Sequence, residues 1–289
     1  MDNLIRDISW VERNELIDSI SKNEDLLTIE PLNSGLEAEV HRIQSAGSSV
    51  VLKIWNRTSK PNVELQYKLL KELYSQGIPV SRPLGWGLDK DMNSVLLTSF
   101  DGFPVMKVNK PTITMLSKIL SDIHMLSIED MDSSLLRKHD FIRYFYPSIE
   151  QHDDIKSLLK ELIPRSGMKQ DQIIHGDFNL GNVLLTEGKY TIIDWTNAQL
   201  GDPRYDIAWS VSLMKIYVSE RLGSLYLQSF LSERQYTFEE MELYEAIASL
   251  RWVLLNRVAD LPKGKDTISR VRNILKNNQY INESFLQVI

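Results

Sequence analysis

The hydrophobic pattern of this chain changes character near residue 101, and this change sharply limits the folds it can adopt. Residues 27–55 contain short β-favouring runs separated by the turn sequences Asn33-Ser34-Gly35 and Ala46-Gly47-Ser48. Farther along, apolar residues recur at helical spacing over residues 113–126 and 155–163. We therefore predict a small antiparallel β meander in the first part and a mainly helical second part.

The join between these parts is also marked in the sequence. Residues 62–76 have helical periodicity and end at Gly77, residues 83–87 read as a turn, and residues 94–100 read as a strand. The dipeptide Asp101-Gly102 then interrupts the pattern. We predict a β-rich nucleotide-binding lobe over residues 1–100. A helical lobe with the catalytic and metal-binding loops and the acceptor pocket would span residues 101–289.

Composition excludes several classes of function. The 289 residues carry a net charge of −6, which does not suit a general nucleic-acid binder. The chain has no cysteine, so it can form neither a disulfide nor a thiolate metal site. Its beginning lacks the apolar core of a secretory signal, and no apolar run approaches the about 20 residues that span a bilayer. We expect a cytoplasmic protein with no membrane or nucleic-acid partner.

One β-rich island within the helical part carries the chemistry. Residues 173–185 read Ile-Ile-His-Gly-Asp-Phe-Asn-Leu-Gly-Asn-Val-Leu-Leu, and the following apolar strand ends in Asp194. This order places Asp177 and Asn182 in one polar loop. Phosphoryl transfer needs a carboxylate to orient the attacking hydroxyl and oxygen ligands to hold magnesium on the phosphates. Taken alone, the loop could also be a capping or Asx turn.

Three ordered motifs together resemble the aminoglycoside phosphotransferase and choline kinase family, and protein kinases more distantly. They are His175-Gly176-Asp177 with Asn182, then Ile193-Asp194-Trp195, then Gly201-Asp202-Pro203 with Asp206-Ile207-Ala208. The resemblance implies a protein-kinase-like, two-lobed α+β fold with ATP in the cleft between the lobes. It also implies transfer of the γ-phosphate to a hydroxyl of a small molecule, such as an aminoglycoside, a choline-like amine alcohol, a macrolide, a sugar or an amino acid.

The same resemblance suggests a role for each residue of the motifs. Asp177 would be the catalytic base, and Asn182 and Asp194 the magnesium ligands. His175 would support the loop by packing and hydrogen bonding, and Asp206 would be structural.

The nucleotide side of the site is predicted by position. Lys53 stands inside the apolar strand of residues 50–54, where related kinases pair a lysine with the α- and β-phosphates. Ser34 and Gly35 occupy the loop that would cover the nucleotide, and main-chain groups of Ser99 and Phe100 would bond the adenine edge. Lys53 could instead lie on a solvent-facing edge. The acidic partner of Lys53 is not assigned, because helical register places Gln66, and not Glu64, at the position where a glutamate is expected.

Two rival functions remain at this point, and several of the residues could instead be purely structural. A nucleotide-binding protein without turnover would keep the same motifs. A protein kinase is disfavoured because Ile193-Asp194-Trp195 replaces Asp-Phe-Gly and no Ala-Pro-Glu follows. The acceptor pocket could use residues 141–146 and the region of Arg251 and Trp252, or these could be core. We read His124 and Trp209 as core, and the acidic residues 239–242 as a solvated helix face or a site for a cation.

Overall fold

The computed structural model describes residues 4–22, 27–32, 38–45, 47–56, 62–129, 131–234 and 236–286. The chain divides into two units. The first contains Met1–Pro104 and Val183–Thr196, and the second contains Val105–Asn182 and Asn197–Ile289.

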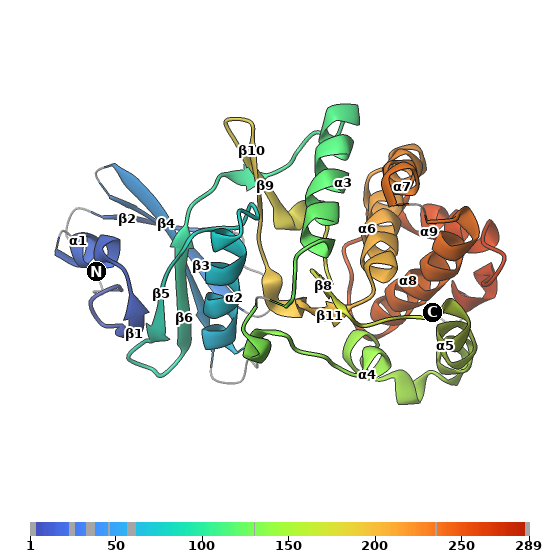
Figure 1. Ribbon diagram of the computed structural model, residues 1–289, viewed down its shortest axis with the longest axis horizontal. Coiled ribbons are helices and arrows are strands. Elements are labelled where there is room, and N and C mark those ends of the chain that lie inside the picture. The colour runs from blue at the N-terminus through green and yellow to red at the C-terminus, as the bar shows by residue number, and fades with distance from the viewer. Residues whose placement is uncertain are drawn as a thin grey trace. The chain divides into compact units, whose positions relative to one another are not determined.

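A six-stranded sheet forms the centre of the first unit (Figure 1). Its strands lie in the order β1-β5-β6-β4-β3-β2, and every neighbouring pair is antiparallel. The strands are β1 (Ser9–Arg13), β2 (Thr28–Pro31), β3 (Ala38–Ser45), β4 (Ser48–Trp55), β5 (Pro83–Leu88) and β6 (Ser94–Ser99). The predicted meander of three strands is confirmed as β2, β3 and β4, since β3 pairs with both of its chain neighbours.

Two helices accompany this sheet. The short helix α1 (Glu15–Lys22) buries Ile17 and Ile20 in the same apolar cluster as Leu52 of β4. The longer helix α2 (Val63–Ser75) packs against β5 and β6. It begins where the Asn62 side chain accepts a hydrogen bond from the Leu65 amide at 2.9 Å, which satisfies one of the free amides at the helix start. The helix predicted over residues 62–76 is confirmed.

The sequence reading of residues 83–87 as a turn is wrong, because these residues form β5. Its central glycines would ordinarily weaken a strand. They are required here because β1 passes very close: a Cβ added to Gly87 would lie 2.4 Å from the Ser9 carbonyl oxygen. β1 and α1 are both additional to the elements predicted from the pattern.

A second, three-stranded sheet completes the first unit. It consists of β7 (Phe103–Pro104), β9 (Val183–Thr186) and β10 (Lys189–Ile192), in the order β10-β9-β7. The Ile192 amide donates a hydrogen bond to the Pro79 carbonyl oxygen at 2.7 Å, which anchors the end of β10 beside the segment after α2. This anchor fixes the backbone two residues before Asp194.

The second unit is mainly helical (Figure 1). Its two short strands, β8 (Gln172–Ile174) and β11 (Gln199–Gly201), pair antiparallel. The helices are α3 (Lys110–His124), α4 (Phe141–Phe145), α5 (Asp153–Ser166), α6 (Pro203–Tyr217), α7 (Glu220–Arg234), α8 (Phe238–Val258) and α9 (Thr267–Lys276). Helices α6 and α8 are buried over most of their residues and pack against each other. They form the core on which the candidate site is built.

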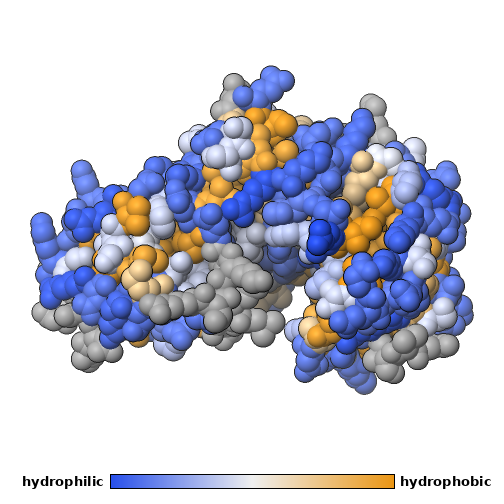
Figure 2. All heavy atoms as spheres, turned by 90° about the horizontal axis from the view of Figure 1, so that it is seen from below, coloured by the Kyte–Doolittle hydropathy of each residue, from blue (hydrophilic) through white to orange (hydrophobic). Residues whose placement is uncertain are grey.

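The surface in Figure 2 is largely hydrophilic, and its hydrophobic residues lie in separate patches. Within the described part of the chain, no helix is both long enough and apolar enough to cross a membrane.

Candidate active site

The loop that carries Asp177 leaves β8 in a conformation that only its glycine allows. Gly176 has φ of +78°, and a Cβ on it would lie 2.6 Å from the Asn197 carbonyl oxygen. His175, just before it, is completely buried. The sharp change of direction at Gly176 therefore leads the chain from the core to Asp177, which is half-buried.

Asp206, near the start of α6, holds this loop from beneath. Its two carboxylate oxygens accept hydrogen bonds from the amides of His175 at 2.8 Å and Gly176 at 2.9 Å. His124 of α3 adds a contact from Nε2 at 3.0 Å. Burial raises the pKa of Asp206, but the hydrogen bonds and charges of its partners outweigh burial and leave the pKa below its ordinary value. The ionised carboxylate therefore anchors two successive amides of the loop.

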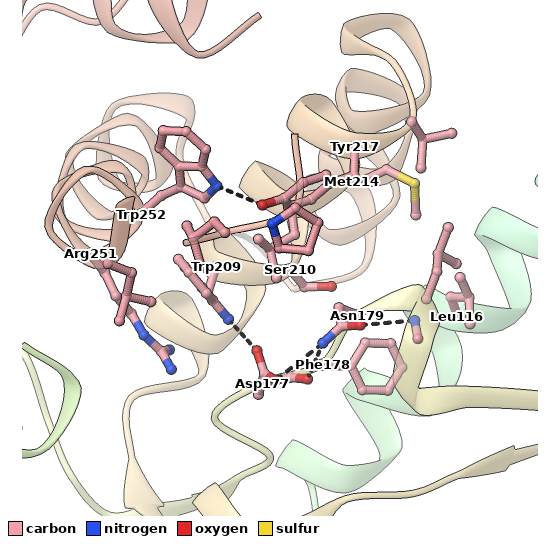
Figure 3. Close-up of a pocket in the computed structure, with 17 residues that line it drawn as sticks. Leu116, Asp177, Phe178, Asn179, Trp209, Ser210, Met214, Tyr217, Arg251 and Trp252 are labelled. Carbon is pink, nitrogen blue, oxygen red and sulfur yellow. Dashed lines mark hydrogen bonds between the residues drawn. The ribbon is translucent and has the colours of Figure 1, made fainter. Parts of the chain in front are cut away.

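The Asp177 carboxylate is itself held in place (Figure 3). Its Oδ1 accepts a hydrogen bond from Trp209 Nε1 at 2.9 Å. Its backbone oxygen accepts from Asn182 Nδ2 at 2.9 Å and from Asn179 Nδ2 at 3.0 Å. The Asp177 amide donates to His175 Nδ1 at 3.2 Å. The structure thus brings Asp177 and Asn182 together, and the carboxylate is oriented before any substrate arrives.

The orientation of the Asn182 side chain suits a role as an oxygen ligand. A carbonyl oxygen can only accept, so the Asn182 atom that faces the Asp177 backbone oxygen is the amide nitrogen. The Asn182 side-chain oxygen is then left for another partner, and such oxygens are ligands that magnesium accepts. No cluster of three or more His, Cys, Asp or Glu side chains suited to a metal occurs in the described ranges. A cation here would complete its coordination with phosphate oxygens and water, as magnesium commonly does.

Asp194, the second predicted metal ligand, belongs to the first unit and follows β10. Its φ of +64° lies in the left-handed region, which is uncommon for a residue other than glycine and is frequent at functional sites. The Thr196 hydroxyl donates a hydrogen bond to Asp194 Oδ1 at 3.0 Å. The Asp194 carboxylate is by itself a hard oxygen ligand of the kind that magnesium prefers.

Lys53 lies in β4, directly between Val40 of β3 and Leu96 of β6, and is partly buried. It is therefore in the interior of the sheet and not at an edge. Across the parts of the chain that are described, no acidic side chain forms an ion pair with Lys53. Glu64, one of its two candidate partners, is exposed and bonds Lys68 on its own helix at 2.6 Å. The Lys53 ammonium group is therefore available to an anion that does not come from the described residues.

Four further residues were predicted to contact the nucleotide: Ser34, Gly35, Ser99 and Phe100. Ser34 and Gly35 lie outside the described residues. The amides of Ser99 and Phe100 already donate hydrogen bonds within the first unit, to Arg82 O at 2.9 Å and to Ser49 O at 3.1 Å. An adenine edge could bond to these two amides only if they leave those partners.

A cavity of about 490 Å³ lies in the second unit beside Asp177 (Figure 3). It is lined by the Asp177 loop and by helices α3, α6 and α8, with Arg251 and Trp252 among the lining residues. Residues 141–146 do not line it. Phe141, Phe145 and Tyr146 are buried, so the core reading holds for these three aromatics. Of the residues predicted for the acceptor pocket, Arg251 and Trp252 line this cavity.

Arg251 connects the cavity to the loop that carries Asp177. It donates a hydrogen bond to the Gly176 carbonyl oxygen at 2.9 Å, and its guanidinium lies 4.1 Å from the ring centre of Trp209 and 4.5 Å from that of Phe145. Arg251 therefore supports both the loop and the tryptophan that bonds Asp177.

Trp209 has a role that sequence reasoning missed, since we had read it only as core. It is 4 % exposed, so it is a core residue, and it also orients Asp177. A signal was present: Trp209 follows Asp206 by three residues, and positions three apart share one face of a helix. A helix whose one face holds Asp206 against the loop also presents Trp209 to that loop.

The model of the phosphotransferase enzyme family matches residues 28–244. The chain belongs to this family. The comparison with curated proteins found no match. Family membership confirms the resemblance drawn from the three motifs.

Solved structures of similar proteins support the expected fold. An amicoumacin kinase, hAmiN, in complex with AMP-PNP, Ca²⁺ and Ami is 16% identical, with TM-score 0.63 over 94% of this chain and 97% of that one. Aminoglycoside phosphotransferase APH(4)-Ia, with AMP-PNP and hygromycin B, is 16% identical, with TM-score 0.66 over 89% and 96%. Choline kinase LicA from Streptococcus pneumoniae is 16% identical, with TM-score 0.61 over 91% and 97%. The fold is therefore the protein-kinase-like α+β fold of these enzymes.

Proposed function

We propose that this protein transfers the γ-phosphate of ATP to a hydroxyl group of a small molecule. The observation that carries the proposal is the placement of Asp177, whose carboxylate is fixed by Trp209 at 2.9 Å and borders a cavity of about 490 Å³. A positioned carboxylate beside a cavity of this size is what a small acceptor alcohol needs for proton removal during transfer.

Each polar residue of the motifs has a part in this proposal. Asp177 orients the acceptor hydroxyl and takes its proton. The oxygens of Asn182 and Asp194 would hold magnesium, which when bound supplies positive charge at the phosphate oxygens. Lys53, which has no acidic partner in the described ranges, would bind the α- and β-phosphates as a point charge.

The absence of an acidic partner for Lys53 also favours a second candidate. In related kinases an ion pair positions this lysine, and without such a pair the protein could bind nucleotide without turning it over. In the first proposal, Lys53 would bind the phosphates without an ion pair to a described acidic side chain. The two candidates therefore differ in turnover and not in nucleotide binding.

The decisive test is magnesium-dependent release of ADP from ATP across a panel of candidate alcohols. The panel would contain aminoglycosides, macrolides, choline, ethanolamine, amino acids and sugars. Asp177→Asn keeps the size of the side chain and removes the base, and Asp171→Asn makes the same change at an exposed site just before β8. Stimulation by one compound that disappears only in Asp177→Asn supports the proposal.

The other outcomes separate the two candidates. Tight magnesium-dependent ATP binding with no ADP release, across this panel and a wider one of uncharged alcohols, would favour the nucleotide-binding protein. Failure to bind ATP by calorimetry, with or without magnesium, would contradict both.

A further inference from the structure

The cavity beside Asp177 is lined mainly by apolar and aromatic side chains, which bears on what it can bind. Helix α6 contributes Leu213 and Met214, the segment after α8 contributes Leu261 and Pro262, and Leu116 comes from α3. A polar molecule would lose its hydration in such a cavity without gaining matching partners, which costs binding free energy. The lining instead favours an acceptor with a substantial apolar body.

The charges on the lining are few and balanced. Among the described residues on the lining, Asp177 is the one carboxylate and Arg251 the one cationic side chain. Arg251 is 7 % exposed and is held by Gly176 and Tyr205 through hydrogen bonds at 2.9 and 3.2 Å. A ligand with several ammonium groups would meet one carboxylate and one fixed positive charge. Such a ligand would have to bury unpaired charges, which is very unfavourable.

Three of the four acidic residues of α8 have partners elsewhere, and the fourth, Glu239, is exposed and does not line the cavity. Glu240 caps its own helix through Thr237 and contacts Arg204, and Glu242 bonds Gln279. Glu245 forms an ion pair with Lys215. None of these glutamates lines the cavity. Of the two readings of residues 239–242, cation recognition therefore has no support at this cavity.

Of the aromatic side chains on the lining, Trp209 is not free to stack on a cation of the ligand. The ring of Trp209 already lies 4.1 Å from the Arg251 guanidinium. Trp252 Nε1 donates a hydrogen bond to the Tyr217 hydroxyl at 3.1 Å, which leaves the tyrosine proton for a ligand acceptor. Burial raises the pKa of Tyr217, so the hydroxyl stays neutral. The Tyr217 hydroxyl is thus a neutral polar anchor on a mainly apolar lining.

We propose that the acceptor is an uncharged alcohol with an apolar body, and not a cationic amine alcohol or a polycationic aminoglycoside. This inference rests on the proposed function for the phosphorylation step, but binding of the alcohol does not depend on it. The hydroxyl would be directed to Asp177, and the apolar body would lie along α6 and the segment after α8.

The test compares pairs of alcohols that match in shape and differ in charge. The first pair is 3,3-dimethylbutan-1-ol and choline, and the second is 2-cyclohexylethanol and 1-(2-hydroxyethyl)piperidine, which is protonated at pH 7. Kanamycin represents a polycation. Affinity is measured by calorimetry without nucleotide, and ADP release is measured separately with ATP and magnesium. We expect the neutral member of each pair to bind at least about tenfold more tightly than its cationic match.

A pair of variants at Leu261 links this preference to the cavity. Leu261 is partly buried on the lining, so a polar substitution there is less damaging than one in the core. Leu261→Asp adds a carboxylate, and Leu261→Asn removes the same apolar surface without charge. We expect Leu261→Asp alone to shift relative affinity toward the cationic members, by about tenfold or more.

The results for the inference and for the proposed function are distinguishable. Neutral alcohols that bind preferentially but are not phosphorylated would uphold the inference and overturn phosphotransfer to them. Preferential binding or phosphorylation of choline or kanamycin would overturn the inference and leave the phosphotransferase intact. Absence of binding by every neutral alcohol would overturn it too, as would equal shifts in Leu261→Asp and Leu261→Asn.

Discussion

The two sets of proposed catalytic residues are held very differently. Asp177, in the second unit, is fixed by Trp209 and Asn182, and its loop is tied to Asp206 and Arg251. In the first unit, Lys53 has no ion pair among described residues, and Asp194 accepts a bond from Thr196. A group that must align a hydroxyl is built in advance, which lowers the cost of reaching the transition state. Lys53 and Asp194, proposed to bind phosphate and metal, have fewer protein partners among the described residues and would gain theirs from the ligand.

The largest expected effect is on turnover, and it separates the two sets. Asp177→Asn should lower kcat by about 10³-fold, in the range for loss of a general base, and leave magnesium-dependent ATP affinity nearly unchanged. Asp194→Ala should lower both, because the metal would lose a ligand. Steady-state kinetics and calorimetry with ATP and magnesium measure the two quantities. Equal losses of ATP affinity in both variants would remove the distinction between base and ligand.

The next effect is on stability. Asp206→Asn keeps the shape of the side chain but removes the charge and turns an amide NH₂ group toward backbone donors. We expect the free energy of unfolding to fall by about 3 kcal/mol, as for other broken buried pairs. Urea unfolding followed by tryptophan fluorescence measures it, with Asp171→Asn as the exposed control. A loss no larger than in that control would mean that Asp206 does not hold the loop.

The same carboxylate predicts the acid limit of stability. Burial raises the pKa of Asp206 and of Asp202. The hydrogen bonds and charges of their partners, with His124 foremost for Asp206 and Arg204 for Asp202, together outweigh burial, so both pKa values lie below the ordinary value of about 3.9. A lowered folded-state pKa contributes stability above that ordinary value, and the contribution is lost as pH falls through the folded pKa. Unfolding free energy should be nearly flat between about pH 6 and 5 with respect to these groups and fall below about pH 4. The fall should be shallower in Asp206→Asn, and an equal slope would contradict this.

A smaller effect is expected at Trp209. Trp209→Phe removes the hydrogen bond to Asp177 and keeps an aromatic ring beside Arg251. Loss of a hydrogen bond to a charged group corresponds to about tenfold in kcat, with the KM for ATP unchanged. A purely structural tryptophan would leave kcat per folded molecule intact. Kinetics normalised to the folded fraction, with Trp252→Phe as a matched change on the far side of the cavity, distinguish the two.

Sequence reasoning predicted more of this molecule where local rules and tertiary context agree. The meander, helix α2 and the helices α3 and α5 follow from periodicity and turn residues. β5 was missed because its glycines serve close contact with β1, which a local rule cannot see. The strands β9 and β10 were located, but their membership of the first unit depends on pairing with β7, far away in the sequence.

The candidate site divides in the same way. Asp177, Asn182 and Asp194 were visible because motif spacing places oxygen ligands next to strands. The role of Trp209 was not, since an indole in an apolar helix reads as core until its nitrogen is seen 2.9 Å from a carboxylate. The partner of Lys53 could not be read either: Glu64 bonds Lys68, and helical register alone does not say which neighbour a lysine chooses.

Lys53 should show the smallest effect on stability, and this completes the comparison. Because Lys53 forms no ion pair in the described ranges, Lys53→Met should change the free energy of unfolding by less than about 0.5 kcal/mol, while ATP affinity falls about tenfold or more. Lys189→Met, at an exposed position of β10 in the same unit, should leave both unchanged. A stability loss in Lys53→Met near that of Asp206→Asn would show that Lys53 is braced by the protein. The contrast between a built-in base and ligand-dependent phosphate contacts would then fail.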